Sequence, residues 1–299
     1  MESGHSDPQQ FLEPLLMAKA LIAAVVVAVL LLTIPAADGA YPGENGRIVA
    51  SDRGIHTFHP DGSHVRKLPG TDNFDIHPRW SPSGRWILFT CMNKDAVGKI
   101  CKMRPDGSDR QRVGDLPRDN FGPVWSPNGK RIAFTHYGTK NRGGIWLMHA
   151  DGTHVRRLTR DLGSGLSWGV NRKIVYNTDA ATKIMTIRLD GTNKRELGSG
   201  WGPQWSPDGK RIAFITYGND QDDESWDAYT MGAHGGNVER IRPWVSASIA
   251  WSPDGRYFVG SDNSGNVARM KVDGSKFRYL DLDHRLRSPD WGPAANHKS

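Results

Sequence analysis

A ten-residue string that occurs twice with one difference constrains the fold of this chain more than any other feature. WSPNGKRIAF occupies residues 125–134, and WSPDGKRIAF occupies residues 205–214. A tryptophan followed by a turn sequence recurs at intervals of 45, 43, 37, 46 and 40 residues, at Trp80, Trp125, Trp168, Trp205, Trp251 and Trp291. Repeats of about 20–50 residues are typical of propellers and solenoids.

A second motif, Asp-Gly followed by Ser or Thr, lies 22 to 26 residues after four of these tryptophans and once before the first. Its copies begin at Asp61, Asp106, Asp151, Asp190 and Asp273. Both motifs are turn sequences, because Pro presets φ and Gly accepts positive φ. Polar and apolar residues alternate between the motifs, as in residues 130–135, which predicts half-buried strands. Each repeat therefore predicts four short antiparallel strands, which form one blade of a β-propeller.

The two ends of the repeated region complement one another. Residues 46–50, 55–58 and 64–68 predict three strands before the first full repeat, and Trp291 lies in a single strand after the last. One C-terminal and three N-terminal strands complete a blade, which closes the ring and leaves no open sheet edge. The sequence therefore predicts an all-β, six-bladed propeller with four-stranded blades over residues 41–293.

The repeated residues are expected to serve the architecture rather than catalysis. A serine nucleophile needs one base at one place, whereas the serine of the tryptophan motif recurs at Ser81, Ser126, Ser206 and Ser252. A phosphate-binding loop needs glycines that open a helix, and no segment beyond the N-terminal leader has helical spacing. We therefore expect each tryptophan to pack between blades while Ser-Pro-Asp-Gly turns the chain.

These motifs resemble the repeats of the TolB-like, or PD40, family of β-propellers. The resemblance rests on WSPDGKRIAF, on IWLMHADGTHVRRLT at residues 145–159, and on the opening YPGENGRI at residues 41–48. It implies a six-bladed propeller that is often exported and often binds other proteins. TolB carries an additional α/β domain and other relatives carry a C-terminal peptidase domain. This sequence matches neither, so neither a Tol–Pal role nor peptidase activity is implied.

The N-terminal 40 residues have the parts of a secretory signal. Lys19 precedes thirteen residues without a polar side chain (20–32), and Pro35 and small residues follow. The apolar run is shorter than the roughly 20 residues of a membrane span, although an uncleaved anchor remains an alternative. We expect export to the cell envelope or medium, with residues 294–299 as a short tail.

The net positive charge of the chain favours an anionic binding partner but does not identify it. The chain has a net charge of +7, and residues 1–39 carry −3, so the remainder carries +10. The basic residues are scattered, which suits solubility as well as binding. We expect a monomeric propeller that binds a protein or an anionic envelope polymer, with no nucleic acid and with membrane contact only through an uncleaved N-terminal segment.

Three histidines are the strongest candidates for chemistry. His77, His136 and His284 map to one face of the ring in blades one, two and six, with Asp75 nearby. Converging imidazoles could hold a metal ion. This arrangement would suit the alternative function, a metal-assisted lyase or hydrolase of an anionic saccharide. The competing interpretation is that all three are ordinary surface residues.

Other features of the same face have structural alternatives. Asp222 and Asp223 belong to an acidic loop, residues 219–224, which suits Ca²⁺ or is simply solvated. Phe74 and Phe121 follow matched Asp-Asn pairs and are expected to fill gaps between blades rather than form a binding patch. Asp52, Asp179 and Asp262 end second strands and are expected to cap loops through backbone amides. No cofactor is otherwise predicted.

The only two cysteines, Cys91 and Cys101, flank the second hairpin of blade one. Aligning the hairpin so that Phe89 faces Met103 places the cysteines opposite one another, where a bridge is geometrically possible. An exported chain meets an oxidising compartment. We therefore predict a disulfide.

Overall fold

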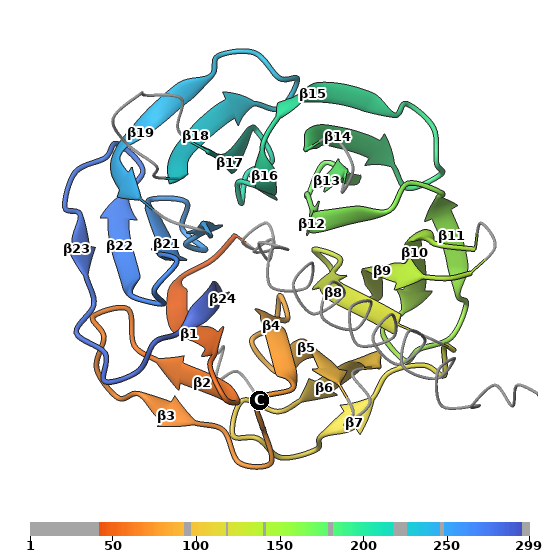
Figure 1. Cartoon of the computed structure of the whole chain (residues 1–299), viewed down its shortest axis with the longest axis horizontal. Helices are drawn as coiled ribbons and strands as arrows, with labels where there is room; N and C mark the ends of the chain where they lie inside the picture. Colours follow the sequence, from red (N-terminus) through yellow and green to blue (C-terminus); the bar gives the residue numbers. More distant parts are fainter. Residues whose placement is uncertain are drawn as a thin grey trace, which may run out of the picture. The chain divides into compact units, whose positions relative to one another are not determined.

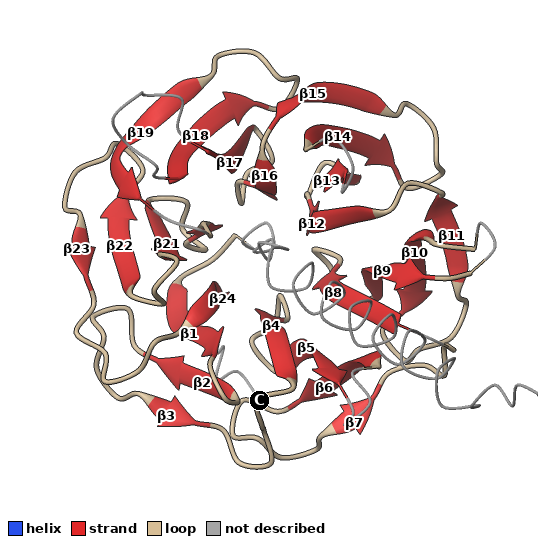
Figure 2. Ribbon diagram, in the orientation of Figure 1, coloured by secondary structure: helices blue, strands red, loops and turns tan. Residues whose placement is uncertain are grey.

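The computed structural model is a ring of six four-stranded blades (Figure 1). It describes residues 42–92, 97–117, 119–139, 142–178, 182–217, 226–245 and 248–294. Within these residues the chain forms strands, turns and loops and no helix (Figure 2). The predicted all-β propeller is therefore confirmed.

Each blade has one strand nearest the ring axis, and all blade strands pair antiparallel with their neighbours. The inner strands are β4 (Asp75–Trp80), β8 (Asp119–Trp125), β12 (Gly163–Trp168), β16 (Trp201–Trp205), β20 (Ala250–Trp251) and β24 (Arg287–Pro293). The second strands are β5 (Ile87–Met92), β9 (Arg131–Tyr137), β13 (Lys173–Thr178), β17 (Arg211–Tyr217), β21 (Tyr257–Ser261) and β1 (Asn45–Ser51). The third strands are β6 (Gly98–Met103), β10 (Gly144–His149), β14 (Lys183–Arg188), β18 (Trp226–Gly232), β22 (Val267–Lys271) and β2 (Ile55–Phe58). The outer strands are β7 (Gln111–Arg112), β11 (Arg156–Thr159), β15 (Arg195–Ser199), β19 (Glu239–Val245), β23 (Arg278–Tyr279) and β3 (Arg66–Lys67).

The ring closes through the composite blade that the sequence predicted. Its strand order is β24-β1-β2-β3, so the C-terminal strand lies innermost and pairs antiparallel with the N-terminal one. Ile48 lies opposite Trp291, and Val49 lies opposite Asp290. The two ends of the propeller are thus held together by a strand ladder.

The repeat tryptophans pack between blades, as expected. Trp80 of blade one lies in one buried cluster with Val49 and Leu68 of blade six, and Trp205 of blade four clusters with Val175 of blade three. All six tryptophans are at most 4% exposed. Removing such a buried indole typically costs about 3–5 kcal/mol, so these side chains account for much of the cohesion between blades.

The serine of the repeated string is bound within its own turn. The Ser206 hydroxyl donates to the Asp208 carboxylate (2.6 Å) and accepts from the backbone amide of Arg211 (2.9 Å). Ser126 and Ser252 make the same pair of bonds with their own neighbours. The hydroxyl proton is therefore engaged in three of the four copies, which agrees with an architectural role.

We call the side on which the inner strands begin the loop face, marked by Asp75, Asp119, Gly163, Trp201 and Arg287. The opposite side, on which they end at or just after the repeat tryptophans, is the turn face. It also carries the Asp-Gly-Ser/Thr turns, in which the Asp carboxylate accepts the amide of the Ser or Thr two residues on, as in Asp151 and Thr153 (2.9 Å).

Candidate functional site

The inner strands share a distortion at the loop face. In five blades the pairing register shifts near the start of the strand, and the residue at the shift has a left-handed backbone. This residue is glycine in blades two, three and four (Gly122, Gly165 and Gly202), but in blades one and six it is His77 (φ 55°) and Ser288 (φ 55°). A non-glycine residue is strained in this region, and such strain tends to be kept where a side chain is needed.

The residues two positions further along the same strands are charged and buried. Arg79 is 2% exposed and Asp290 is 3% exposed. Burial raises the pKa of Asp290 to about 6, although the nearby charge of Arg79 and the amide of Trp80 oppose that rise. Blades one and six adjoin at the seam where the ring closes. The seam therefore carries four polar side chains, those of His77, Arg79, Ser288 and Asp290. Blade two has Gly122 and Val124 at the same two strand positions.

His77 contributes an unusual imidazole to this seam. Its Nδ1 atom is enclosed and makes no hydrogen bond. Desolvation, together with the nearby charge of Arg79, lowers the pKa of His77 to about 3. The ring is therefore neutral at physiological pH, and its nitrogens can accept or donate a hydrogen bond without a change in charge.

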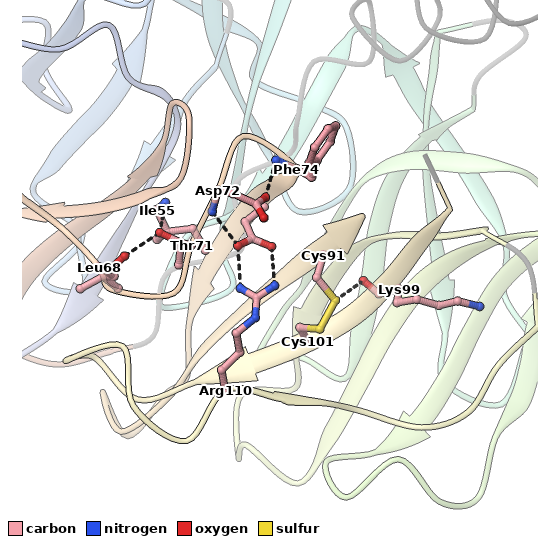
Figure 3. Close-up of polar contacts among 10 residues, drawn as sticks. Ile55, Leu68, Thr71, Asp72, Phe74, Cys91, Lys99, Cys101 and Arg110 are labelled. Atoms are coloured by element: carbon pink, nitrogen blue, oxygen red, sulfur yellow. Dashed lines mark hydrogen bonds and ion pairs between the residues drawn. A yellow bond between two sulfur atoms is a disulfide. The ribbon is translucent and has the colours of Figure 1, made fainter. Parts of the chain in front are cut away.

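Asp75 is fully engaged in an ion pair rather than open to a metal. The guanidinium of Arg110 donates two hydrogen bonds to its two carboxylate oxygens, at 2.6 and 2.9 Å (Figure 3). The same guanidinium lies over the ring of Phe89, 5.0 Å from its centroid. Asp75 also accepts the backbone amide of Asp72 (3.2 Å). This carboxylate therefore fixes the turn that leads into blade one.

The other two candidate histidines have separate partners. His136 lies within β9 and is only 6% exposed, so the interpretation as an ordinary surface residue is wrong for this histidine. Its Nδ1 lies 2.9 Å from Oδ1 of Asn120 on the paired strand. His284 is exposed, and its ring centroid lies 5.0 Å from that of His56.

These positions do not form the metal site considered from sequence. Among the described residues, no three His, Cys, Asp or Glu side chains are grouped so that they could hold an ion. The acidic loop with Asp222 and Asp223 lies outside the described residues, as does Asp179. Of the predicted loop caps, Asp262 accepts the backbone amide of Asn266 (2.9 Å).

The two phenylalanines differ, although their sequence contexts match. Phe121 is 9% exposed and packs against Gly98 of blade one, where a β-carbon would overlap its ring, so it fills the gap between blades as expected. Phe74 is 38% exposed, and Figure 3 shows its ring pointing away from Arg110 and from the cysteines. The expectation of a buried plug is therefore wrong for Phe74.

Two further aromatic residues of the loop face were missed by sequence reasoning. Trp201 begins β16 and Trp226 begins β18, and their rings meet edge to face with centroids 5.0 Å apart. Both are partly exposed. The sequence did contain a signal for them. Five of the eleven tryptophans lie outside the repeat positions, and Trp201 and Trp226 are two of these five.

Cys91 and Cys101 form a disulfide, with Cα atoms 5.8 Å apart. The register on which the bridge was argued is wrong by two residues. Cys101 lies opposite Phe89, and Cys91 lies opposite Lys99, so the bridge runs diagonally across the hairpin. The cysteines lie in the buried cluster between blades six and one.

Comparison with solved structures places this architecture among known propellers. TolB from Acinetobacter baumannii superposes with a TM-score of 0.70 at 20% identity, over 85% of this chain and 68% of that one. A chain of a nidogen/laminin complex gives 0.65 at 15% identity, over 82% and 98%. The chain has a TolB-like propeller fold. An oligogalacturonate lyase in complex with manganese shares the fold more distantly, with a TM-score of 0.55 at 10% identity over 84% and 77%.

Sequence comparison finds one local similarity. No family model matches the chain. The uncharacterized peptidase YuxL of Bacillus subtilis is 33% identical over 107 residues. This match covers 30% of the present chain and 15% of the length of YuxL.

In the described part of the chain there is no helix of the length and apolar character that a membrane span requires.

Proposed function

We propose that this chain is an exported, non-enzymatic propeller that binds a protein through its loop face. The observation that carries the proposal is the difference between the two faces. On the turn face, the repeated polar side chains are bonded within their turns. The loop face instead presents Phe74, Trp201 and Trp226, which are only partly covered. Aromatic residues are enriched at protein interfaces and often dominate their binding energy.

Export is supported by two independent features. The N-terminal 40 residues have the parts of a secretory signal. The Cys91–Cys101 disulfide suits an oxidising compartment, because cytosolic thiols are kept reduced. Fractionation of cells that produce the chain is expected to recover it outside the cytoplasm. Recovery of a fully reduced chain in the cytoplasm would contradict this part of the proposal.

The binding proposal is tested by capturing partners from an envelope extract with loop-face variants. Phe74→Ala and Trp201→Ala are expected to weaken capture about tenfold or more, which is typical for aromatic anchors. Tyr279→Ala is the matched control, because Tyr279 is 51% exposed but lies on the outer strand β23. Equal loss in all three variants, or in none, would contradict a loop-face interface.

Salt distinguishes a protein partner from the alternative, an anionic envelope polymer. Contacts of exposed charges are screened at high ionic strength, whereas apolar contacts are not. Capture that survives about 0.5 M salt and depends on Phe74 supports a protein partner. Capture that is lost in salt and is insensitive to Phe74→Ala would favour the polymer, to which the net positive charge of the chain is suited.

A further inference from the structure

Two turns on the turn face are flanked by histidine on both sides. The sequence His-x-Asp-Gly-Ser/Thr-His occupies residues 59–64 in blade six and residues 149–154 in blade two. The rings of His59 and His64 stack with centroids 4.6 Å apart, and those of His149 and His154 stack at 4.2 Å. In each pair the first histidine is partly exposed and the second is exposed. Two accessible imidazoles therefore meet at each turn.

The turn geometry itself brings these two positions together. In blade one the same positions hold Arg104 and Asp109, whose side chains form an ion pair at 3.0 Å. Blade three has Arg188 and Asn193 there, and blade five has two lysines. These two positions can therefore hold other pairs of side chains. The turn does not require histidine at both of them.

A hydrogen-bond chain fixes which nitrogen of the second histidine is available. The Thr153 hydroxyl donates its only proton to Oδ1 of Asp151, at 2.7 Å. Nδ1 of His154 lies 2.9 Å from the same hydroxyl oxygen, so Nδ1–H must be the donor. The neutral ring therefore keeps a lone pair on Nε2. Such an outer hydrogen bond to the non-ligating nitrogen is the usual way a metal-binding histidine is oriented.

Part of this arrangement is present in blade six. Nδ1 of His64 lies 2.9 Å from the Ser63 hydroxyl, and Asp61 accepts the backbone amide of Ser63 at 2.9 Å. The second imidazole thus again lies against the hydroxyl of the preceding residue, which is a serine in place of the threonine.

We propose that each histidine pair binds one divalent transition-metal ion, such as Zn²⁺, Ni²⁺ or Cu²⁺, through its two imidazoles. Imidazole nitrogen suits these ions, with metal–nitrogen distances of about 2.0–2.1 Å for zinc. The first ring of each stacked pair must rotate so that its Nε2 faces the same ion as Nε2 of the second ring, which its partial exposure at a turn permits. Since no third His, Cys, Asp or Glu ligand is grouped with either pair among the described residues, water or a partner's donor completes the coordination. Binding is therefore moderate in strength and exchangeable.

The test is calorimetric titration of the untagged full chain with Zn²⁺. His149→Arg with His154→Asp installs the residue types of the blade-one pair, so the turn has a precedent in this fold. This double variant is expected to bind one zinc equivalent fewer than the wild type, and so is His59→Arg with His64→Asp. The variant that carries all four substitutions is expected to bind two zinc equivalents fewer than the wild type. Unchanged stoichiometry in folded double variants would overturn the proposal. Other histidines, including the His56–His284 pair, are common to all variants and cancel in the comparison.

A second measurement tests the orientation by Thr153. Thr153→Val removes the acceptor for Nδ1–H of His154. It is expected to lower the zinc affinity of the blade-two site by about tenfold. Thr192→Val is the matched control, because Thr192 makes the same bonds to Asp190 in blade three, where no histidine pair is present. Equal zinc affinity in the two variants would overturn the assignment of Nε2 as the ligand atom.

Discussion

The carboxylate of Asp290 accepts a hydrogen bond from the backbone amide of Trp80 at 2.8 Å, and so ties the last strand of the ring to the first full blade. The serine at the equivalent position of blade three makes the same bond, because the Ser167 hydroxyl accepts the amide of Trp205 at 3.0 Å. In these two blades the residue before the repeat tryptophan thus faces the next blade. At the closing seam this position carries an ionisable group, which makes the seam sensitive to pH.

Asp290 is expected to make the protein less stable as pH rises from about 4 to about 6. Its folded pKa is about 6, raised from an ordinary value of 3.8 by burial. Between these values the folded chain holds a proton that the unfolded chain has released, so the free energy of unfolding falls with increasing pH. The shift corresponds to at most about 3 kcal/mol. Denaturant unfolding at pH 4 and pH 7 measures it.

Asp290→Asn is the control for this pH effect. The amide retains an oxygen that can accept the Trp80 N–H but does not titrate. The stability of the wild type relative to the variant is expected to fall between pH 4 and pH 6, because every other titrating group is shared. Parallel pH profiles for the two proteins would show that Asp290 has an ordinary pKa.

Gly292→Ala is expected to destabilise the same seam. A β-carbon at Gly292 would overlap the buried indole of Trp80, and Gly169 stands in the same relation to Trp205. Overpacking of this kind typically costs about 1–3 kcal/mol. Gly236→Ala is the matched control, because a β-carbon there meets nothing within 4 Å. Thermal unfolding should separate the two variants, and equal melting temperatures would contradict the close approach.

The architecture was predictable because its determinants are local and periodic. The repeat tryptophan and the Ser-Pro-Asp-Gly turn encode blade number and strand order without reference to distant residues. The site was less predictable, because it depends on neighbours from other strands. The burial of His136 follows from its pairing with Asn120, and the exposure of Phe74 distinguishes it from Phe121 despite matched sequences. The register of the cysteine hairpin depended on pairing that the sequence left undetermined.

Removal of the disulfide is expected to lower stability without unfolding the ring. The bridge closes a short loop within one hairpin, and native disulfides typically contribute about 2–4 kcal/mol. Cys91→Ala with Cys101→Ala should therefore lower the melting temperature while the circular dichroism of the folded protein is retained. Thiol titration of the native wild type should find no free cysteine. Two titratable thiols would show that the bridge does not form.

The strained residues at the seam predict a trade-off between stability and binding. His77 and Ser288 occupy the left-handed position that glycine fills in blades two to four. Ser288→Gly and His77→Gly are each expected to raise stability by up to about 1 kcal/mol through relief of backbone strain, less any packing lost with the side chain. Gly202→Ala introduces the same strain in blade four and should destabilise by a similar amount.

If the seam contributes to the partner interface, the stabilised His77→Gly variant should bind less tightly than the wild type. Strain at a functional position is retained for the side chain it presents, and here that is a neutral imidazole with an unbonded Nδ1. Melting temperature and partner capture, measured on the same preparations, give the two readouts. A His77→Gly protein that is more stable and captures partners as well as the wild type would show that the imidazole has no part in binding.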